Sequence, residues 1–203
     1  VPTAGGIHYA GIFSDITALK VSEDQLIKIV HYDPLTNLPN RLLFMERLNG
    51  KLLSCAKSNI TLGIIYIDLD DFSHINEEYG EEIGDSLMIE IAHRLSGSMR
   101  ENDFISRVGS DEFLGYLSDI ANDVQFEVLI EKIMRNLSAP ILIEGHDLQI
   151  TGSIGVRFFS CSDAKNAEIL VRQADQAMIA AKQSGKHRYK VFDPKKDLAT
   201  KIK

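Results

Sequence analysis

The stretch TLGIIYIDLDDF, from Thr61 to Phe72, constrains the fold of this chain more than any other segment. It is rich in isoleucine and then changes abruptly to acidic residues. A short apolar run of this kind is typical of a strand that is buried in a protein core. We therefore predict a buried strand that ends in the carboxylates of Asp68, Asp70 and Asp71.

Helical and strand-like patterns are mixed along the remainder of the chain. Apolar residues recur at helical spacing in the segments 41–57, 82–97, 124–137 and 167–184. Strand-like runs occupy 104–108, 140–145, 148–159 and 187–192. The polar pair His146-Asp147 is predicted to separate the two middle strands. Because hairpins and helical connections both occur, the predicted fold class is α+β, an α/β sandwich around a mixed sheet.

Composition limits the classes of partner. The net charge of -7 argues against a general nucleic-acid or membrane-surface binder, so no nucleic-acid partner is expected. The two cysteines have no metal-like spacing, and no apolar run approaches the ~20 residues of a membrane span. With no signal peptide, a cytoplasmic domain is expected. A start at Val1 fits a fragment, which leaves membrane segments further upstream open.

A second acidic pair follows a predicted tight turn. The run FISRV leads into Gly109-Ser110, a pair typical of a two-residue hairpin turn, and then into Asp111 and Glu112. If the hairpin lies beside the buried strand, Asp111 and Asp68 can converge. Carboxylates suit Mg²⁺, which takes one or two of them and leaves room for phosphate oxygens. The same acids could also simply solvate the ends of strands.

Basic residues gather at the end of the last predicted helix. Lys182, Lys186 and Arg188 lie there, and Gly185 reads as the glycine that ends the helix. Cations at this position complement the helix dipole, and this alone can explain why they are there. The alternative interpretation is that they bind phosphate. The sequence contains no Walker-type phosphate loop, no dinucleotide fingerprint after a strand and no Ser-His-Asp or Cys-His arrangement.

Four segments occur in a fixed order between residues 33 and 192. They are DPLTNLPNR from Asp33, IDLDDF with IN, YG and GD from Ile67, RVGSDEF from Arg107, and ADQAM with AK and SGKHR from Ala174. In this order and spacing they resemble the GGDEF domain, the family of diguanylate cyclases. The resemblance implies a central, mainly antiparallel five-stranded sheet wrapped by helices, similar to adenylyl cyclases and palm-type polymerases, with the signature on a β-hairpin.

The resemblance also implies a reaction and its site. Two GTP molecules are condensed into cyclic di-GMP and two pyrophosphates, with one GTP held by each protomer of a facing homodimer. Asp68, Asp111 and the carbonyl of Leu69 would hold Mg²⁺ or Mn²⁺, and Glu112 would assist the metal or the attacking 3′-hydroxyl. The implied GTP-binding residues are Asn76 and Asp85 for guanine, Lys182 and Lys186 for the β- and γ-phosphates, and Asp71, Phe72, Ser73, Gly109 and Ser110 around the phosphates and ribose.

An RxxD sequence, Arg100 to Asp103, precedes the signature at the family's spacing. In the family this sequence marks an inhibitory site for the product, cyclic di-GMP. Arginine pairs bidentately with phosphate or guanine acceptors, and aspartate accepts from guanine N–H groups. The alternative is an ordinary solvated turn.

Several residues depart from the family's pattern. Ser110 replaces the second glycine of the signature, and at φ > 0 a serine costs about 1 kcal/mol. A substrate displaced by an ångström can lose about a hundredfold in rate. Ser73 replaces a common lysine, Lys186 a usual arginine, and Glu77 and Glu81 a usual Asp and His. These changes predict intact metal and guanine ligands with weaker surroundings for the transition state.

Both ends of the chain carry softer resemblances. Residues 1–20 resemble the last strand and exit of a PAS sensory domain, and 21–32 resemble the signalling helix that follows, which often pairs as a coiled coil. Residues 33–192 would be the GGDEF domain. Residues 193–203 would begin a linker, in a sequence similar to the junction that leads into a phosphodiesterase EAL domain.

Three functions remain open on these grounds. The first is a working diguanylate cyclase, supported by the full set of metal, guanine and phosphate residues. The second is a GTP-binding regulatory module without catalysis, suggested by Ser110 and Ser73. The third is a receptor that binds cyclic di-GMP at Arg100 and Asp103 and controls an attached domain.

Overall fold

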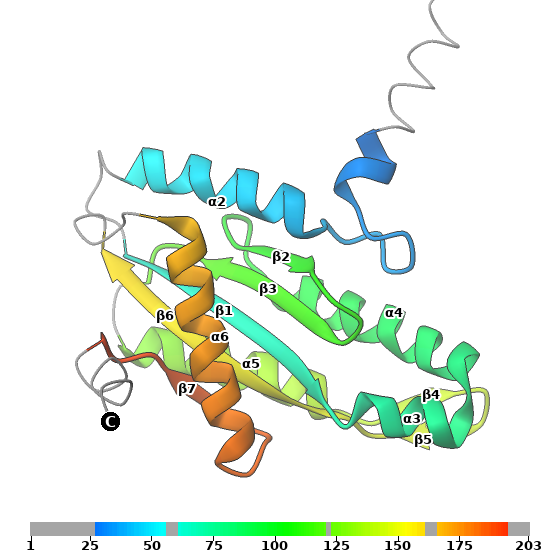
Figure 1. The fold of residues 1–203 in the computed structure, drawn as a ribbon. Coiled ribbons are helices and arrows are strands. Elements are labelled where there is room, and N and C mark those ends of the chain that lie inside the picture. The colour runs from blue at the N-terminus through cyan, green and yellow to red at the C-terminus, as the bar shows by residue number, and fades with distance from the viewer. Residues whose placement is uncertain (1–26, 56–60, 121–122, 161–165, 195–203) are drawn as a thin grey trace, which may run out of the picture.

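The computed structural model describes residues 27–55, 61–120, 123–160 and 166–194 of the 203-residue chain (Figure 1). The predicted sensory-domain strand, most of the linker helix and most of the C-terminal linker lie outside these ranges. Residues 27–31 are helical and lead into the DPLTNLPNR turn. Within the described ranges, no helix is both long and apolar enough to cross a bilayer.

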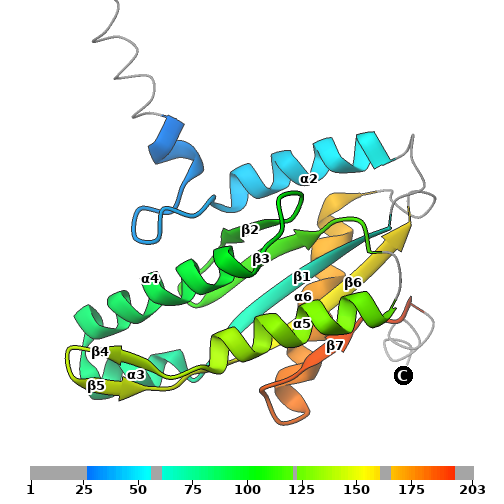
Figure 2. The same ribbon diagram turned by 180° about the vertical axis from the view of Figure 1, so that it is seen from behind.

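A five-stranded sheet in the order β2-β3-β1-β6-β7 forms the centre (Figures 1 and 2). Its strands are β1 (Thr61–Asp70), β2 (Phe104–Arg107), β3 (Glu112–Leu117), β6 (Thr151–Ser160) and β7 (Tyr189–Val191). β6 and β7 run parallel, and the other neighbours are antiparallel. One face is covered by α2 (Arg41–Cys55) and α6 (Ala167–Gln183), the other by α4 (Glu81–Ser98) and α5 (Asp123–Ser138). The predicted α+β sandwich is confirmed.

The central strand β1 contributes to both cores. Ile65, Ile67 and Leu69 belong to the core under α4 and α5, whereas Ile64 and Tyr66 belong to the core under α2 and α6. Successive side chains of a strand point to opposite faces, and a strand covered on both faces is therefore apolar throughout. The same alternation puts Asp68 and Asp70 on the face of α6.

A short helix and a small hairpin differ from the expected pattern. α3 (Phe72–Tyr79) follows β1, and β4 (Ile141–Ile143) pairs with β5 (His146–Leu148). The prediction that His146-Asp147 separates two strands is wrong, because both residues lie within β5. The turn falls at Glu144 and Gly145, whose φ angles of 49° and 86° supply the two left-handed residues that a tight hairpin needs.

The DPLTNLPNR turn is fastened to the base of the β2–β3 hairpin. Arg107 Nη1 lies 3.0 Å from Asp33 Oδ1, and Arg107 N donates to Pro39 O. Thr36 also donates to Asp33 Oδ1, from its amide at 2.8 Å and its hydroxyl at 2.6 Å. Burial alone would raise the pKa of Asp33, but the hydrogen bonds from Thr36 and Arg107 outweigh it and hold this pKa below its ordinary value. These contacts set the start of α2 against the acidic hairpin.

Arg107→Met should destabilise the domain by about 1–2 kcal/mol in urea unfolding, because the half-buried Asp33 carboxylate loses its cation. Since the pKa of Asp33 is lowered, its contribution to stability is complete above the ordinary carboxyl pKa and is lost as the pH falls through the lowered value. The difference from wild type should therefore shrink in acid. Arg135→Met is the control, because Arg135 and Glu131 are exposed and 3.9 Å apart. Equal losses in the two variants would contradict the prediction.

Candidate functional site

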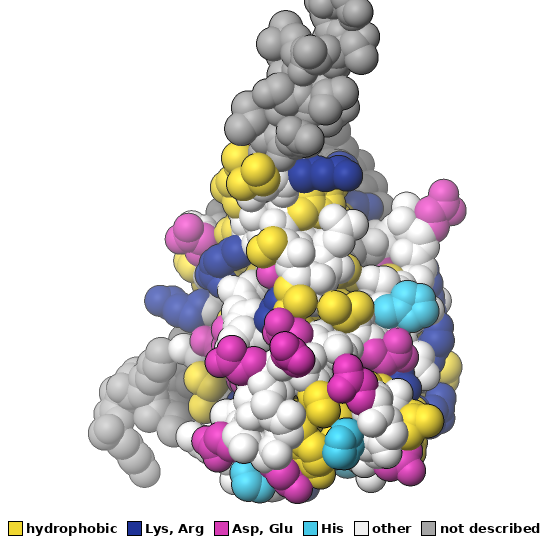
Figure 3. Space-filling model, turned by 90° about the vertical axis from the view of Figure 1, so that its right-hand side faces the viewer, with side chains coloured by type: hydrophobic (Ala, Val, Ile, Leu, Met, Phe, Trp, Pro, Cys, Tyr) yellow, Lys and Arg dark blue, Asp and Glu magenta, His cyan; other side chains and the backbone are white. Residues whose placement is uncertain are grey.

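The acidic end of β1 and the acidic hairpin meet at one end of the sheet. Asp68 pairs with Glu112 across β1 and β3, and Leu69 N donates to Asp111 O at 3.0 Å. Directly opposite residues on neighbouring strands project from the same face. Figure 3, which looks at this end of the sheet, shows acidic side chains gathered over its middle and lower part. The expected convergence of the two acidic segments is thus present.

Asp68 is a buried carboxylate with a lysine beside it. Its side chain is 11% exposed, and Lys182 Nζ lies 2.5 Å from its Oδ1. This Oδ1 has no directed hydrogen-bond partner in the described part of the chain, so the contact with Lys182 is an ion pair in poor hydrogen-bond geometry. Burial raises the pKa of Asp68 to about 6, the nearby Asp111 and Glu112 carboxylates add to the rise, and Lys182 opposes it.

Asp70 has a different surrounding although it lies on the same face. Its Oδ1 accepts from Ser153 Oγ at 2.7 Å, and its Oδ2 accepts from Thr151 Oγ1 at 2.7 Å and from His187 N at 3.0 Å. These donors come from β6 and from the turn after α6. Asp70 therefore joins the end of β1 to the segment that carries Lys186. Both of its carboxylate oxygens are used in hydrogen bonds that hold the structure together.

That second lysine reaches the start of α3. Lys186 and His187 both have left-handed backbones, with φ of 57° and 44°. Lys186 Nζ lies 2.5 Å from Asp71 Oδ1. Asp71 itself is left-handed, with φ of 58°, and α3 begins immediately after it at Phe72. The first N–H groups of a helix have no acceptor within it, so Phe72 and Ser73 present donors beside the two lysines.

The predicted guanine residues lie on α3 and α4. Gly80, with φ of 91°, separates the two helices and turns the chain back. Asn76 Oδ1 is buried and has no partner among the described residues. A Cβ at position 84 would lie 1.8 Å from this oxygen, so Gly84 is required for the Asn76 side chain to lie where it does. Asp85 is the exposed next residue of α4.

The hairpin connection is longer than predicted. Val108 N donates to Glu112 O at 2.9 Å, so Gly109, Ser110 and Asp111 together form the connection, and a two-residue Gly-Ser turn is wrong. The prediction of backbone strain at Ser110 is also wrong, because Ser110 is not among the residues with positive φ. The true steric demand is at Gly109, where a Cβ would lie 2.4 Å from Glu112 Oε2.

Ser110 is instead tied to its neighbours by hydrogen bonds. Its hydroxyl donates to Asp111 Oδ1 at 2.8 Å, and its carbonyl accepts from Arg107 Nη2 at 2.7 Å. The serine hydroxyl therefore touches one of the two predicted metal-binding carboxylates.

The RxxD segment forms a hydrogen-bonded turn ahead of β2. Asp103 Oδ1 accepts from Ser118 N at 2.8 Å, and its Oδ2 accepts from Arg100 N at 2.9 Å. The side chain of Arg100 is exposed. Asp103 thus has a structural role in this turn whatever Arg100 binds.

The donor set at the strand end fits a hard cation. Asp68 and Asp111 would supply carboxylates and Leu69 a carbonyl, whereas a group of three or more His, Cys, Asp or Glu side chains suited to a metal is absent from the described ranges. Mg²⁺ needs no such group, because it completes its coordination with water and phosphate oxygens. The buried Asp68 Oδ1 is an oxygen that such a cation would satisfy.

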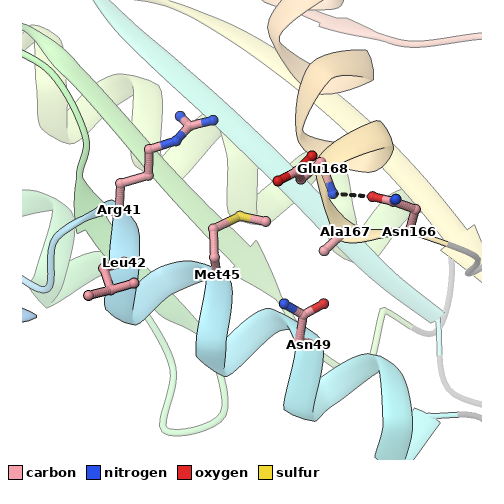
Figure 4. A pocket seen from close by; sticks show the side chains of 7 residues that line it. All are labelled: Arg41, Leu42, Met45, Asn49, Asn166, Ala167 and Glu168. Carbon is pink, nitrogen blue, oxygen red and sulfur yellow. Dashed lines mark hydrogen bonds between the residues drawn. The ribbon is translucent and has the colours of Figure 1, made fainter.

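A cavity of about 660 Å³ lies away from this chemistry, between α2 and the start of α6 (Figure 4). Its lining residues are Arg41, Leu42, Met45, Asn49, Asn166, Ala167 and Glu168. Asn166 Oδ1 accepts from Glu168 N at 2.8 Å, which caps α6. None of the predicted site residues lines this cavity, so we assign the candidate site to the strand end.

One further residue of the site went unpredicted. Tyr66 precedes Asp68 by two positions, so the period of a strand places both on one face. Burial, with the carboxylates of Glu112 and Asp175 adding to it, raises the pKa of Tyr66 to about 12. Its phenol therefore keeps its proton at neutral pH and lies close enough to Glu112 for that carboxylate to raise its pKa. Strand period was the signal that could have identified it.

Comparison with known proteins agrees with this geometry. A family model described as diguanylate cyclase, GGDEF domain, matches residues 30–188. The chain is 33% identical over 177 residues to the bifunctional diguanylate cyclase/cyclic di-GMP phosphodiesterase MucR of Pseudomonas aeruginosa, covering 87% of this chain and 26% of MucR. It is 33% identical over 157 residues to diguanylate cyclase TpbB of the same species, covering 77% of this chain and 36% of TpbB. The chain thus spans a minor part of both relatives.

A solved structure leads to the same family. The GGDEF domain of TpbB from Pseudomonas aeruginosa superposes with a TM-score of 0.78 at 30% identity, covering 84% of this chain and 99% of that one. The residues matched by the family model include the end of β1, the hairpin and the lysines at the end of α6. The chain therefore belongs to the GGDEF family of diguanylate cyclase domains.

Proposed function

We propose that this domain condenses two GTP molecules into cyclic di-GMP and two pyrophosphates. The observation that carries the proposal is the buried Asp68 carboxylate, which lies beside Lys182 and opposite Glu112 at the end of β1. Acidic groups for a cation and basic groups for phosphates stand side by side there, as phosphoryl transfer requires.

Each half of the nucleotide has matching groups. Asn76 and Asp85 recognise guanine, because an amide and a carboxylate can match the acceptors and N–H donors of its edge. Lys182 and Lys186 bind the β- and γ-phosphates, helped by the N–H groups at the start of α3. Lys186 acts there as a point charge, since it lacks the fork of an arginine.

Asp68, Asp111 and the Leu69 carbonyl hold a divalent cation, Mg²⁺ or Mn²⁺. When bound, this cation neutralises phosphate charge and activates the attacking oxygen. The 3′-hydroxyl oxygen of one GTP bonds to the α-phosphorus of the other, and the bond to the pyrophosphate oxygen breaks. Glu112 assists as the acceptor of the hydroxyl proton, with the neutral phenol of Tyr66 nearby. A second attack of the same kind, by the 3′-hydroxyl of the other GTP, closes the ring. This requires a homodimer whose two sites face each other.

The wider assembly is also a proposal. Residues 33–192 are the GGDEF domain of a larger cytoplasmic signalling protein, with a PAS-like sensor upstream and an EAL domain downstream. Ile27, Ile29 and Val30 are exposed on residues 27–31, which suits a linker helix that pairs with its copy in the dimer.

Asp111→Ala should abolish cyclic di-GMP formation, because it removes a carboxylate of the cation site. Purified protein incubated with GTP and Mg²⁺, with product resolved by chromatography, measures this. Asp147→Ala is the matched control, since Asp147 is an exposed acid on β5 outside the site. Persistent product in Asp111→Ala, or equal loss in both variants, would refute the assignment.

Ser110→Gly should change the rate by no more than about threefold, because Ser110 is not held at positive φ and needs no glycine. Gly109→Ala should lose about tenfold or more, because its Cβ would meet Glu112 Oε2 and displace that carboxylate. The initial rate of pyrophosphate release compares the two. Strong activation by Ser110→Gly would instead support the regulatory module without catalysis.

Cyclic di-GMP should bind the exposed Arg100 and inhibit the reaction. Arg100→Ala should then weaken product binding in calorimetry by about tenfold or more and relieve inhibition. Arg135→Ala, at another exposed arginine, should do neither. Asp103→Ala is a poor probe, because it also removes the acceptor of Ser118 N. Unchanged binding in Arg100→Ala would remove this inhibitory site.

A further inference from the structure

We propose that Lys182 competes with the divalent cation for the Asp68 carboxylate, so that nucleotide and metal binding are coupled through this one side chain. The inference rests on the proposed function, since it takes Asp68 as a cation ligand and Lys182 as a phosphate-binding residue. It adds that Lys182 weakens cation binding in the absence of nucleotide and strengthens it when nucleotide is present.

The two lysines of the site differ in their partners. Lys182 pairs with Asp68, a proposed cation ligand whose side chain is only 11% exposed. Lys186 makes an equally short pair with Asp71, which is 67% exposed and is not a proposed ligand. Both lysines belong to the same basic segment and are expected to bind phosphate. Lys186 is therefore a control within the same chain for the effect that removing any positive charge near the site has on cation binding.

The contact of Lys182 falls on the oxygen that the cation needs. Lys182 Nζ is 2.5 Å from Asp68 Oδ1, which has no directed hydrogen bond within the described residues. Mg²⁺ binds carboxylate oxygens at about 2.1 Å, so an ammonium and a cation on this oxygen would stand less than about 5 Å apart. Like charges at this separation repel strongly where water is excluded. Lys182 must therefore leave Asp68 before Oδ1 can bind a cation.

Nucleotide offers Lys182 another anion. The four-carbon stem of lysine is flexible, and Lys182 is 32% exposed, so its ammonium can turn toward phosphates bound beside α3. That movement frees Asp68 for the cation. By reciprocity, a cation on Asp68 frees Lys182 for phosphate, and each ligand raises the affinity of the other.

Mn²⁺ binding measured by electron paramagnetic resonance tests this without relying on turnover. The whole chain is titrated as wild type, Lys182→Gln and Lys186→Gln, alone and with 3′-deoxy-GTP, which has no attacking hydroxyl. Without nucleotide, Lys182→Gln should bind Mn²⁺ about fivefold more tightly than wild type, as expected for loss of one competing ion pair. Lys186→Gln should stay within about twofold of wild type. The nucleotide should tighten Mn²⁺ binding less in Lys182→Gln than in wild type.

Lys182→Arg keeps the charge and should bind Mn²⁺ like wild type, and it serves as the second variant if Lys182→Gln does not fold. Equal or weaker Mn²⁺ binding by Lys182→Gln would overturn the proposal, as would tighter binding by Lys182→Arg or an equal gain in Lys186→Gln. A failure of the proposed function can be distinguished from a failure of this inference. Tighter Mn²⁺ binding by Lys182→Gln with no cyclic di-GMP from wild type would retain the competition and remove the cyclase.

Discussion

The carboxylate of Asp70 is the contact on which the rest of the site depends. It accepts hydrogen bonds from two hydroxyl groups of β6 and from His187 N in the turn after α6. A buried carboxylate with several donors is held firmly, and each donor is held by it in turn. The end of the central strand is thereby fixed to the segment that positions Lys186.

Asp68 and Asp70 show how neighbouring identical residues acquire different chemistry. Both project from the face of α6, two positions apart. Asp70 is surrounded by neutral donors, which use its lone pairs for structure. Asp68 has no directed hydrogen bond on Oδ1 in the described part of the chain, and burial with nearby acids raises its pKa to about 6. A carboxylate in that position is stabilised by a cation, and Lys182 provides one from α6.

The sequence predicted the long helices, the main sheet and the meeting of the two acidic segments, because an isoleucine-rich strand and a hairpin have strong local patterns. It could not show how the surroundings of Asp68 and Asp70 differ, since the donors to Asp70 come from β6 and from residue 187, distant in the chain. The role of Gly84 was hidden for the same reason, because it depends on how closely Asn76 packs against α4. The turn at Glu144 was missed because a left-handed pair outweighed the polarity of His146-Asp147.

The serine in the signature illustrates a limit of comparing residues with a motif. A motif records two glycines, but in this hairpin only the first has a neighbour, the Glu112 side chain, where a Cβ would lie. The second position has an ordinary backbone, and Ser110 uses its hydroxyl to hold Asp111 Oδ1. A substitution at a motif position therefore strains the chain itself only when the backbone or a close neighbour excludes the new side chain. Ser110 meets neither condition, and its hydroxyl donates to the Asp111 carboxylate.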